Sequence, residues 1–329
     1  MREKYIDYTK GFAIILMLFG HTMTRTNQIH MWIYSFHMPI FFIVCGILLS
    51  EKHYKSLKSA AWKRVYTAGI PYYIWGSILA IFYSILDIFS RSPISFGEKM
   101  LRLISLQGID SLWFLPVYIL ASIGIMILNE KATMGGGRLI TILFALSYIV
   151  AAPFLSLNWY MEVISKICIG ICFIEIGFVI AKFNIIEKLP LWGDVFLLIM
   201  GYILARINGE VEMSAGNIGN PFLYFLCASV TSVAIMSLLK KNENNTSRML
   251  DILGIYGKYS MIILCTNNLL IEIIRLCDYK ITGNILISLG MFGCIMFTLI
   301  LMVLEWLIIK FSEGKLGVLF GKLKTVNIR

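Results

Sequence analysis

Charged side chains are scarce in this chain, and their scarcity excludes most soluble folds. Only 15% of the 329 residues are Asp, Glu, Lys or Arg, whereas 58% are hydrophobic and the mean hydropathy is +0.79. Soluble domains usually carry about 25% charged residues. The composition therefore predicts an integral membrane protein with many membrane-spanning segments.

The sequence also lacks loops long enough for a soluble domain and lacks a cysteine framework. The longest plausible loops, at 50–65, 89–110 and 240–257, are too short for an independent core. We therefore expect a single membrane-embedded domain over residues 1–329. All seven cysteines lie within or at the ends of apolar segments, where cysteine behaves as a small hydrophobic residue. They indicate neither disulfides nor a metal site.

Apolar runs close to the ~20 residues that cross a bilayer recur along the whole chain. Breaks that are charged or contain Gly, Pro or Asn separate these runs. The pattern predicts an all-α fold, a polytopic membrane helical bundle. We expect ten transmembrane helices, at 6–24, 31–49, 66–88, 111–128, 138–157, 163–181, 191–207, 220–239, 258–275 and 282–309.

The distribution of Lys and Arg predicts the orientation of the bundle. With ten spans, the two termini and the loops after every second span hold 21 of the 29 basic residues. Cytoplasmic loops carry the excess of basic residues, so both termini are expected in the cytoplasm. Basic loops facing anionic lipid account for the formal charge of +10 without a nucleic-acid partner. Loops rich in Lys, Ile and Asn are typical of an AT-rich bacterial genome, and we expect a bacterial cytoplasmic membrane.

A histidine ends the first apolar segment, at a depth in the membrane where a polar side chain is unusual. Lys10 and His21 are eleven residues apart, which on a helix places them about 20° apart and about 16 Å along the axis. Lys10 then lies near the cytoplasmic surface and His21 near the outer side. An imidazole can take up a proton near neutral pH, so His21 is a candidate general base. A purely structural hydrogen-bonding role is the alternative.

A second histidine lies next to a proline in the second apolar segment. Pro39 removes one backbone hydrogen bond and is expected to kink the helix beside His37. Two histidines on consecutive segments can share a cavity in the outer half of the membrane. For His37 the spacing favours a structural hydrogen bond between helices.

Several motifs in the first 116 residues resemble the acyltransferase-3 family in identity and order. The similarity is closest to its fucose 4-O-acetylase-like branch, and the ten-helix pattern extends it to the whole chain. The motifs are Asp7-x-x-Lys10-Gly11 with Gly20-His21, FHMPIFF at 36–42 with Cys45-Gly46, Lys63-Arg64 before IPYYIWG at 70–76, and LWFLP at 112–116.

The resemblance implies a membrane O-acyltransferase. Such an enzyme takes an acyl group, usually acetyl, from cytoplasmic acyl-CoA and delivers it to a hydroxyl of a cell-surface glycan. Lys10 and His21 fall on the family's basic-x10-His motif, which makes His21 the catalytic base. His37 is the candidate donor for the oxyanion. Acetyl-CoA is then a substrate, and no bound cofactor is expected.

Further residues acquire roles through the same resemblance. Lys10, Lys63 and Arg64 would hold the phosphates of acyl-CoA, although the second arginine of the family's Arg-x-x-Arg pair is Thr67 here. Trp113 would stack on the acceptor sugar or belong to the aromatic belt of the membrane. Asn267 stands where the family often has a histidine, so a second titratable group is missing.

Other functions stay open at this point. A non-catalytic carrier or flippase for a lipid-linked glycan would also place polar residues inside the membrane. A family member that binds without turnover is another alternative, as is succinyl transfer in place of acetyl transfer. Glu175 lies in the middle of a span and requires a partner. The expected partners are acyl-CoA, an envelope saccharide and the bilayer, with a homo-oligomer open.

Overall fold

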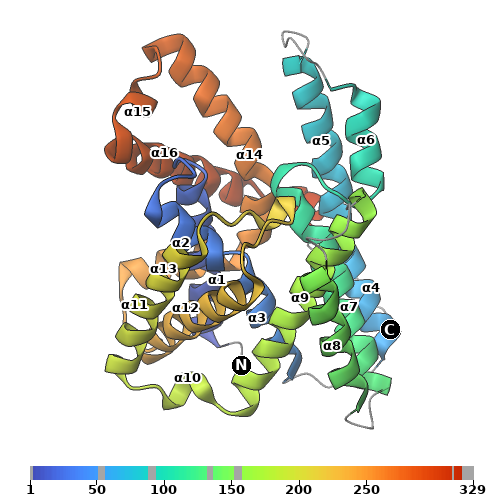
Figure 1. The fold of residues 1–329 in the computed structure, drawn as a ribbon. Coiled ribbons are helices and arrows are strands. Elements are labelled where there is room, and N and C mark those ends of the chain that lie inside the picture. The colour runs from blue at the N-terminus through green and yellow to red at the C-terminus, as the bar shows by residue number, and fades with distance from the viewer. Residues whose placement is uncertain are drawn as a thin grey trace. The chain divides into compact units, whose positions relative to one another are not determined.

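The computed structural model of the chain describes residues 3–50, 56–87, 94–131, 136–151, 158–312 and 315–320. Over these residues the protein is built from helices, and their β-pairing is limited to one isolated bridge between Glu212 and Asn217 (Figure 1). The chain divides into two compact units. Unit 1 comprises Met1–Tyr54 and Gly124–Ser260, and unit 2 comprises Lys55–Ile123 and Met261–Arg329. That the whole chain acts as the single domain expected from the sequence stays a prediction.

Unit 1 contains the first two predicted spans and the middle of the chain. Its elements are α1 (Lys4–Gly20), α2 (Gln28–Phe36), α3 (Pro39–Ser50), α8 (Gly136–Ala151), α9 (Trp159–Lys182), α10 (Ile185–Lys188), α11 (Leu191–Asn208), η4 (Met213–Ala215), α12 (Pro221–Lys241) and α13 (Arg248–Lys258). The most extensive helix pairs within it are α11 with α12, α1 with α13 and α3 with α9.

Unit 2 joins two segments that are far apart in the sequence. Its elements are α4 (Leu57–Arg64), the π-helical turn η1 (Val65–Gly69), α5 (Ile70–Asp87), α6 (Phe96–Ile104), η2 (Asp110–Trp113), α14 (Ser260–Cys277), η5 (Asp278–Thr282), α15 (Ile285–Ser288), α16 (Gly290–Ser312) and η6 (Lys315–Phe320). The helix α7 (Phe114–Lys131) begins in unit 2 and ends in unit 1.

Eight helical segments of the described residues are long and apolar enough to cross a membrane, which confirms the polytopic helical class. They are Gln28–Ser50, Leu57–Asp87, Asp110–Asn129, Trp159–Lys182, Leu191–Asn208, Pro221–Lys241, Ser260–Ile281 and Gly290–Ser312. Of the other two predicted spans, the first corresponds to α1, with 17 residues. The fifth corresponds to α8, and its residues 152–157 lie outside the described residues. The number of ten spans and the cytoplasmic termini stay predictions.

Several boundaries differ from those expected, each for a local reason. The kink predicted at Pro39 is a break, because α2 ends at Phe36 and α3 begins at Pro39, which has no N–H to continue the helix. The predicted loop 89–110 contains the helix α6. The predicted span 282–309 is interrupted between α15 and α16, where Gly290 has a φ of 56° in the left-handed region.

The contact between α3 and α9 shows why the Cys45-Gly46 motif contains glycine. A Cβ on Gly46 would lie 2.0 Å from the carbonyl oxygen of Ile174, and one on Gly177 would lie 2.2 Å from that of Ile43. Both distances are far inside van der Waals contact. The two backbones therefore approach so closely that only glycine fits on either side, as in small-residue packing between membrane helices.

Candidate functional site: a histidine cluster in unit 1

The helix α1 carries the two residues of the basic-x10-His spacing. It runs without interruption from Lys4 to Gly20, and His21 caps it with helical backbone angles (φ −66°, ψ −15°). Because the helix is continuous, its geometry places Lys10 and His21 about 16 Å apart along one face. Lys10 is half-buried near the first end of the helix, and His21 is half-buried at the other.

Tyr34 of α2 holds the imidazole of His21 by a hydrogen bond. The phenolic oxygen of Tyr34 lies 3.1 Å from Nδ1 of His21, and the two rings meet edge to face with centroids 6.0 Å apart. Gly20 makes this approach possible, because a Cβ there would come within 2.9 Å of the Tyr34 ring. The glycine of the Gly-His pair thus allows Tyr34 to lie against His21.

The structure adds a third histidine that the sequence analysis missed. His30 stacks on the ring of Tyr34 with centroids 3.9 Å apart and an interplanar angle of 23°. Its side chain is buried, with the residue 3% exposed, and its Nδ1 has no hydrogen-bond partner. The signal was present in the sequence, because His30 precedes His37 by seven residues, or about two helical turns. His21, His30, Tyr34 and His37 together form what we call the histidine cluster.

His37 is engaged by its own helix. Its Nδ1 lies 2.9 Å from the carbonyl oxygen of Ile33, and its ring contacts Tyr34 with centroids 4.8 Å apart. A carbonyl oxygen only accepts hydrogen bonds, so Nδ1 carries a proton and is the donor of this hydrogen bond. In neutral His37 the other nitrogen, Nε2, is then an acceptor. The oxyanion-donor role predicted for His37 therefore requires its imidazolium form.

An ionic contact lies beside the histidine cluster. The guanidinium of Arg25, in the segment between α1 and α2, lies 3.4 Å from a carboxylate oxygen of Glu210 and 3.6 Å from one of Glu212. Both carboxylates belong to the segment between α11 and α12. Under the predicted topology these segments are on the outer side, so the contact ties two outer loops together, and Arg25 and Glu210 both interact electrostatically with His30.

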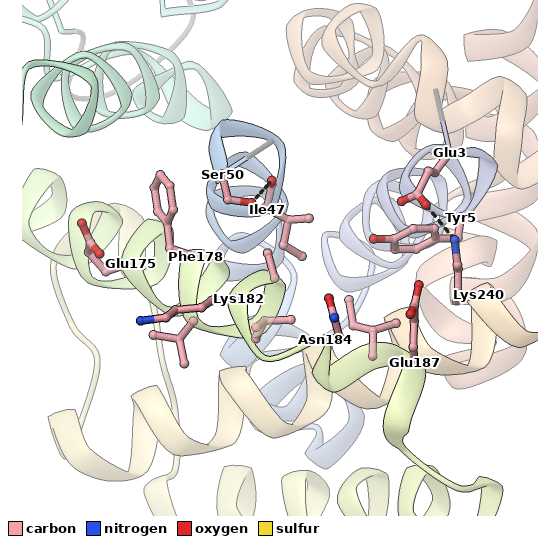
Figure 2. Close-up of a pocket in the computed structure, with 14 residues that line it drawn as sticks. Glu3, Tyr5, Ile47, Ser50, Glu175, Phe178, Lys182, Asn184, Glu187 and Lys240 are labelled. Atoms are coloured by element: carbon pink, nitrogen blue, oxygen red, sulfur yellow. Dashed lines mark hydrogen bonds and ion pairs between the residues drawn. The ribbon is translucent and has the colours of Figure 1, made fainter. Parts of the chain in front are cut away.

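A pocket of about 710 Å³ opens at the other end of unit 1 (Figure 2). It is lined by the ends of α1, α3, α9, α10 and α12, which the predicted topology places in the cytoplasm. Within it the ammonium of Lys240 lies 2.8 Å from Glu3 and also 3.1 Å from Glu243. Glu175 lines this pocket and is 7% exposed. The carboxylates make the pocket a poor match for a polyphosphate.

The remaining predicted site residues belong to unit 2. Arg64 donates a hydrogen bond to the hydroxyl of Tyr118, and its guanidinium carbon lies 5.1 Å from the centre of that ring. Lys63 is exposed beside it at the end of α4. Trp113 ends the short helix η2 and is 7% exposed, so protein covers most of its surface. Within unit 2, Arg64 therefore has an aromatic support that the sequence did not indicate.

Asn267 has a structural environment in α14. It is fully buried, and its Oδ1 accepts a hydrogen bond from the hydroxyl of Ser111, 3.3 Å away. One position earlier, Thr266 donates to the buried carboxylate of Glu305 over 2.7 Å. Position 267 is the one at which the family often has a histidine. Here its amide connects α14 to η2.

Comparison with known proteins supports one family. A family model described as an acyltransferase domain, of the acyltransferase-3 type, matches residues 3–306. No curated protein and no solved structure gave a significant match.

Proposed function

The chain belongs to the acyltransferase-3 family and is a multi-pass membrane acyltransferase, and on that premise we propose the reaction that it performs. The proposed reaction moves an acyl group, acetyl in the first instance, from cytoplasmic acyl-CoA to a hydroxyl of an envelope saccharide. We place the protein in a bacterial cytoplasmic membrane. The fucose 4-O-acetylase-like branch remains a part of this proposal.

His21 is the proposed general base, and its hydrogen bond to Tyr34 is the observation that carries the proposal. The bond engages Nδ1 at 3.1 Å, and we assign the other ring nitrogen, Nε2, to the substrate hydroxyl. When Nδ1–H donates to the phenolic oxygen, Nε2 is unprotonated and can accept a proton. This hydrogen-bonding pattern is the one by which an orienting group fixes the tautomer of a catalytic histidine.

The proposed chemistry is a direct transfer. Nε2 takes the proton of the acceptor hydroxyl as the oxygen attacks the thioester carbonyl, and a new C–O bond forms. The tetrahedral intermediate then collapses, the C–S bond breaks, and the imidazolium returns the proton to the CoA sulfur. General base catalysis of this kind contributes about 10²- to 10⁴-fold to the rate.

The donor approaches from the predicted cytoplasmic side. We propose that Lys10, Lys63 and Arg64 hold the phosphates, because guanidinium and ammonium groups form charge-assisted hydrogen bonds with phosphate oxygens. Lys10 is the basic residue on the same helix as His21, and about 16 Å separate their two heights. That separation suits the flexible arm of acyl-CoA.

The experiment compares cells that carry the wild-type protein, His21→Ala, Thr22→Ala or no gene. Base-labile acyl groups on the envelope polysaccharide are released and identified by mass, so that acetyl and succinyl are both detected. Thr22 is the matched control, because it lies at the same helix end and its hydroxyl donates to the carbonyl of Phe19 in α1 over 2.8 Å.

The expected result is a loss of base-labile acyl groups in His21→Ala and in cells without the gene. Thr22→Ala should retain them, with both variant proteins present in the membrane at the wild-type level. Acyl groups that are unchanged in all four strains contradict the proposed transfer and favour the carrier or flippase. If His21→Ala retains base-labile acyl groups while cells without the gene lose them, the role of His21 as the base is contradicted.

A further inference from the structure

The segment between α6 and η2 has an unusual backbone. Leu106, Gly108 and Asp110 all have positive φ, of 64°, 79° and 48°. Glycine adopts this conformation freely and aspartate occasionally, but leucine is strained in it. Strained residues persist only where their surroundings hold them in place, and they cluster at functional sites. The strained backbone therefore marks this segment as a candidate functional region.

Hydrogen bonds from two helices of unit 2 hold this segment. The hydroxyl of Tyr72 in α5 donates to the carbonyl of Leu103 over 2.7 Å. From the other side, Ser111 donates to the carbonyl of Leu264 over 3.0 Å and accepts from the amide of Asn268, also over 3.0 Å. The contacts at both ends fix where the residues between them lie.

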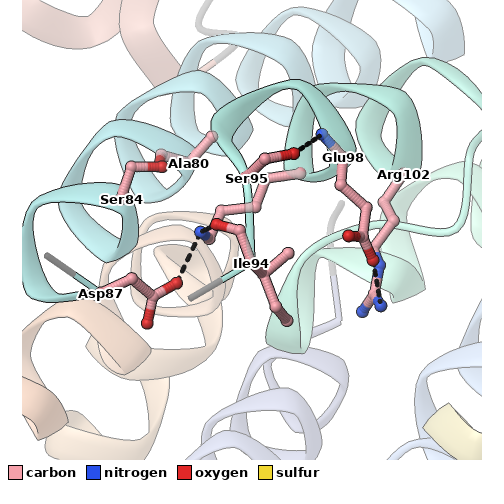
Figure 3. A network of polar contacts seen from close by, with 8 residues as sticks. Ala80, Ser84, Asp87, Ile94, Ser95, Glu98 and Arg102 are labelled. Atoms are coloured by element: carbon pink, nitrogen blue, oxygen red, sulfur yellow. Dashed lines mark hydrogen bonds and ion pairs between the residues drawn. The ribbon is translucent and has the colours of Figure 1, made fainter. Parts of the chain in front are cut away.

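A partly buried ion pair holds α6 against α5. The ammonium of Lys99 lies 2.7 Å from the carboxylate of Asp87 and also donates to the carbonyl of Ile94. Figure 3 shows Asp87 and Ile94 near each other, with the exposed pair of Glu98 and Arg102 on the far side of Ser95. Because Asp87 ends α5, the pair anchors the hairpin at its tip.

A group of polar side chains gathers beside the strained segment, and we call it the Asp110 cluster. The hydroxyl of Tyr83 donates to the carboxylate of Asp110. Glu272 and Arg275 of α14 form an ion pair of 2.9 Å, and both interact electrostatically with Asp110 and Tyr83. Asp110 is exposed, and the side chain of Arg275 is 47% exposed. Two carboxylates, a guanidinium and a phenol are thus presented together.

The predicted topology places this cluster on the outer side. Under that topology α5 and α14 both run outward, so the Asp87 end of one and the Cys277 end of the other lie toward the cell surface. An exposed carboxylate next to a membrane helix faces water and not lipid, because burying a charge in lipid is costly. A soluble group arriving from the cell surface can therefore reach Asp110.

We infer that the Asp110 cluster is a binding subsite for a neutral saccharide, of the class that the proposed reaction acylates. This inference rests on the proposed function for its biological role, but the binding itself can be tested alone. Carboxylate and guanidinium groups hold neighbouring sugar hydroxyls by charge-assisted hydrogen bonds, and Tyr83 adds a phenol that donates and accepts. Two carboxylates against one guanidinium disfavour an anionic sugar.

The test measures sugar binding to the purified full-length protein in nanodiscs. Saturation-transfer NMR titrations use methyl α-D-glucopyranoside and methyl N-acetyl-β-D-glucosaminide as neutral probes and glucuronate as the anionic probe. The main variant is Asp110→Asn, because asparagine tolerates the left-handed backbone at this position and removes only the charge. Tyr83→Phe is the second variant, and Arg102→Gln is the control on the same hairpin.

The expected result is that a neutral probe binds the wild type and Arg102→Gln equally. Asp110→Asn should raise its dissociation constant about tenfold or more, as expected for a lost hydrogen bond to a charged group. Tyr83→Phe should weaken binding to a smaller extent. The inference is overturned if neither neutral probe binds the wild type, if both variants bind like the wild type, or if glucuronate binds more tightly than the neutral probes.

The same proteins separate this inference from the proposed function. His21→Ala should retain binding of the neutral probe that depends on Asp110, although it transfers no acyl group. If binding depends on Asp110 while the wild type produces no base-labile acyl groups, the subsite stands and the acyl transfer fails. If acyl transfer occurs but Asp110→Asn leaves both sugar binding and acceptor KM unchanged, the subsite fails and the transfer stands.

Discussion

Replacing Tyr34 by phenylalanine removes one hydroxyl from the histidine cluster and keeps the ring on which His30 stacks. The change therefore isolates the hydrogen bond of 3.1 Å to Nδ1 of His21. One hydrogen bond between neutral groups contributes about 0.5–1.5 kcal/mol. If Tyr34 acts only by orienting His21, the turnover rate falls by about 2- to 13-fold. Loss of the base itself lowers the rate by about 10²- to 10⁴-fold.

Two measurements check this prediction. The first is the initial rate at which base-labile acyl groups appear on the polysaccharide, normalised to the amount of protein in the membrane. The second is the tautomer of His21, read from ¹⁵N NMR of histidine-labelled protein. The chain has four histidines, so the spectrum is simple, and His21→Gln assigns the signal. The wild type should show Nδ1 protonated, and Tyr34→Phe should populate both tautomers.

Tyr202→Phe is the matched control for Tyr34→Phe. It removes a tyrosine hydroxyl in the same unit that donates to Gln28 over 2.9 Å, and it leaves His21 untouched. An unchanged rate and an unchanged tautomer in Tyr34→Phe would refute the positioning role. A rate loss above about 100-fold would also refute it, because a single neutral hydrogen bond is too weak to account for that loss.

Two further predictions concern stability. Gly46→Ala should lower the thermal unfolding temperature of the purified protein strongly, because its Cβ would meet the backbone of α9 at 2.0 Å, and overpacking costs about 1–3 kcal/mol. Gly124→Ala, whose Cβ meets its first neighbour at 4.0 Å, should be tolerated, and equal effects of the two would contradict this reasoning. Burial alone would raise the pKa of Glu243, but hydrogen bonds from Lys240 and from two backbone N–H groups of α1 outweigh it, and the pKa lies below its ordinary value of 4.5. Its stabilising effect is therefore present at neutral pH and lost as the pH falls below about 4.5, so the difference in unfolding temperature between the wild type and Glu243→Gln should shrink there and not stay constant.

Local patterns were sufficient for most helices and for the first catalytic candidate. Apolar runs predicted helices over most of α5, α9, α12 and α16, because a span must satisfy its own backbone hydrogen bonds in lipid and its length is a property of the local sequence. The Lys10 and His21 spacing could be read in the same way, because both residues lie on one uninterrupted helix. The family followed from short motifs in order, and the family model confirms it.

Other parts of the site depended on contacts between elements. His30 was missed because its importance comes from the ring of Tyr34 and not from its own segment. The support of Arg64 by Tyr118, and the contact of Asn267 with Ser111, join residues more than fifty positions apart. The segment 89–110 was expected to be a loop because its apolar run is too short to span a membrane.

The sequence by itself determined that this chain is a helical membrane protein of the acyltransferase-3 family with His21 at the end of its first helix. Only the tertiary structure decided which groups surround that histidine and where the Asp110 cluster forms. The physical reason is that helix formation in lipid depends on residues a few positions apart. The neighbours of a side chain across a helix contact depend instead on how each helix is rotated and how closely glycines allow two backbones to approach.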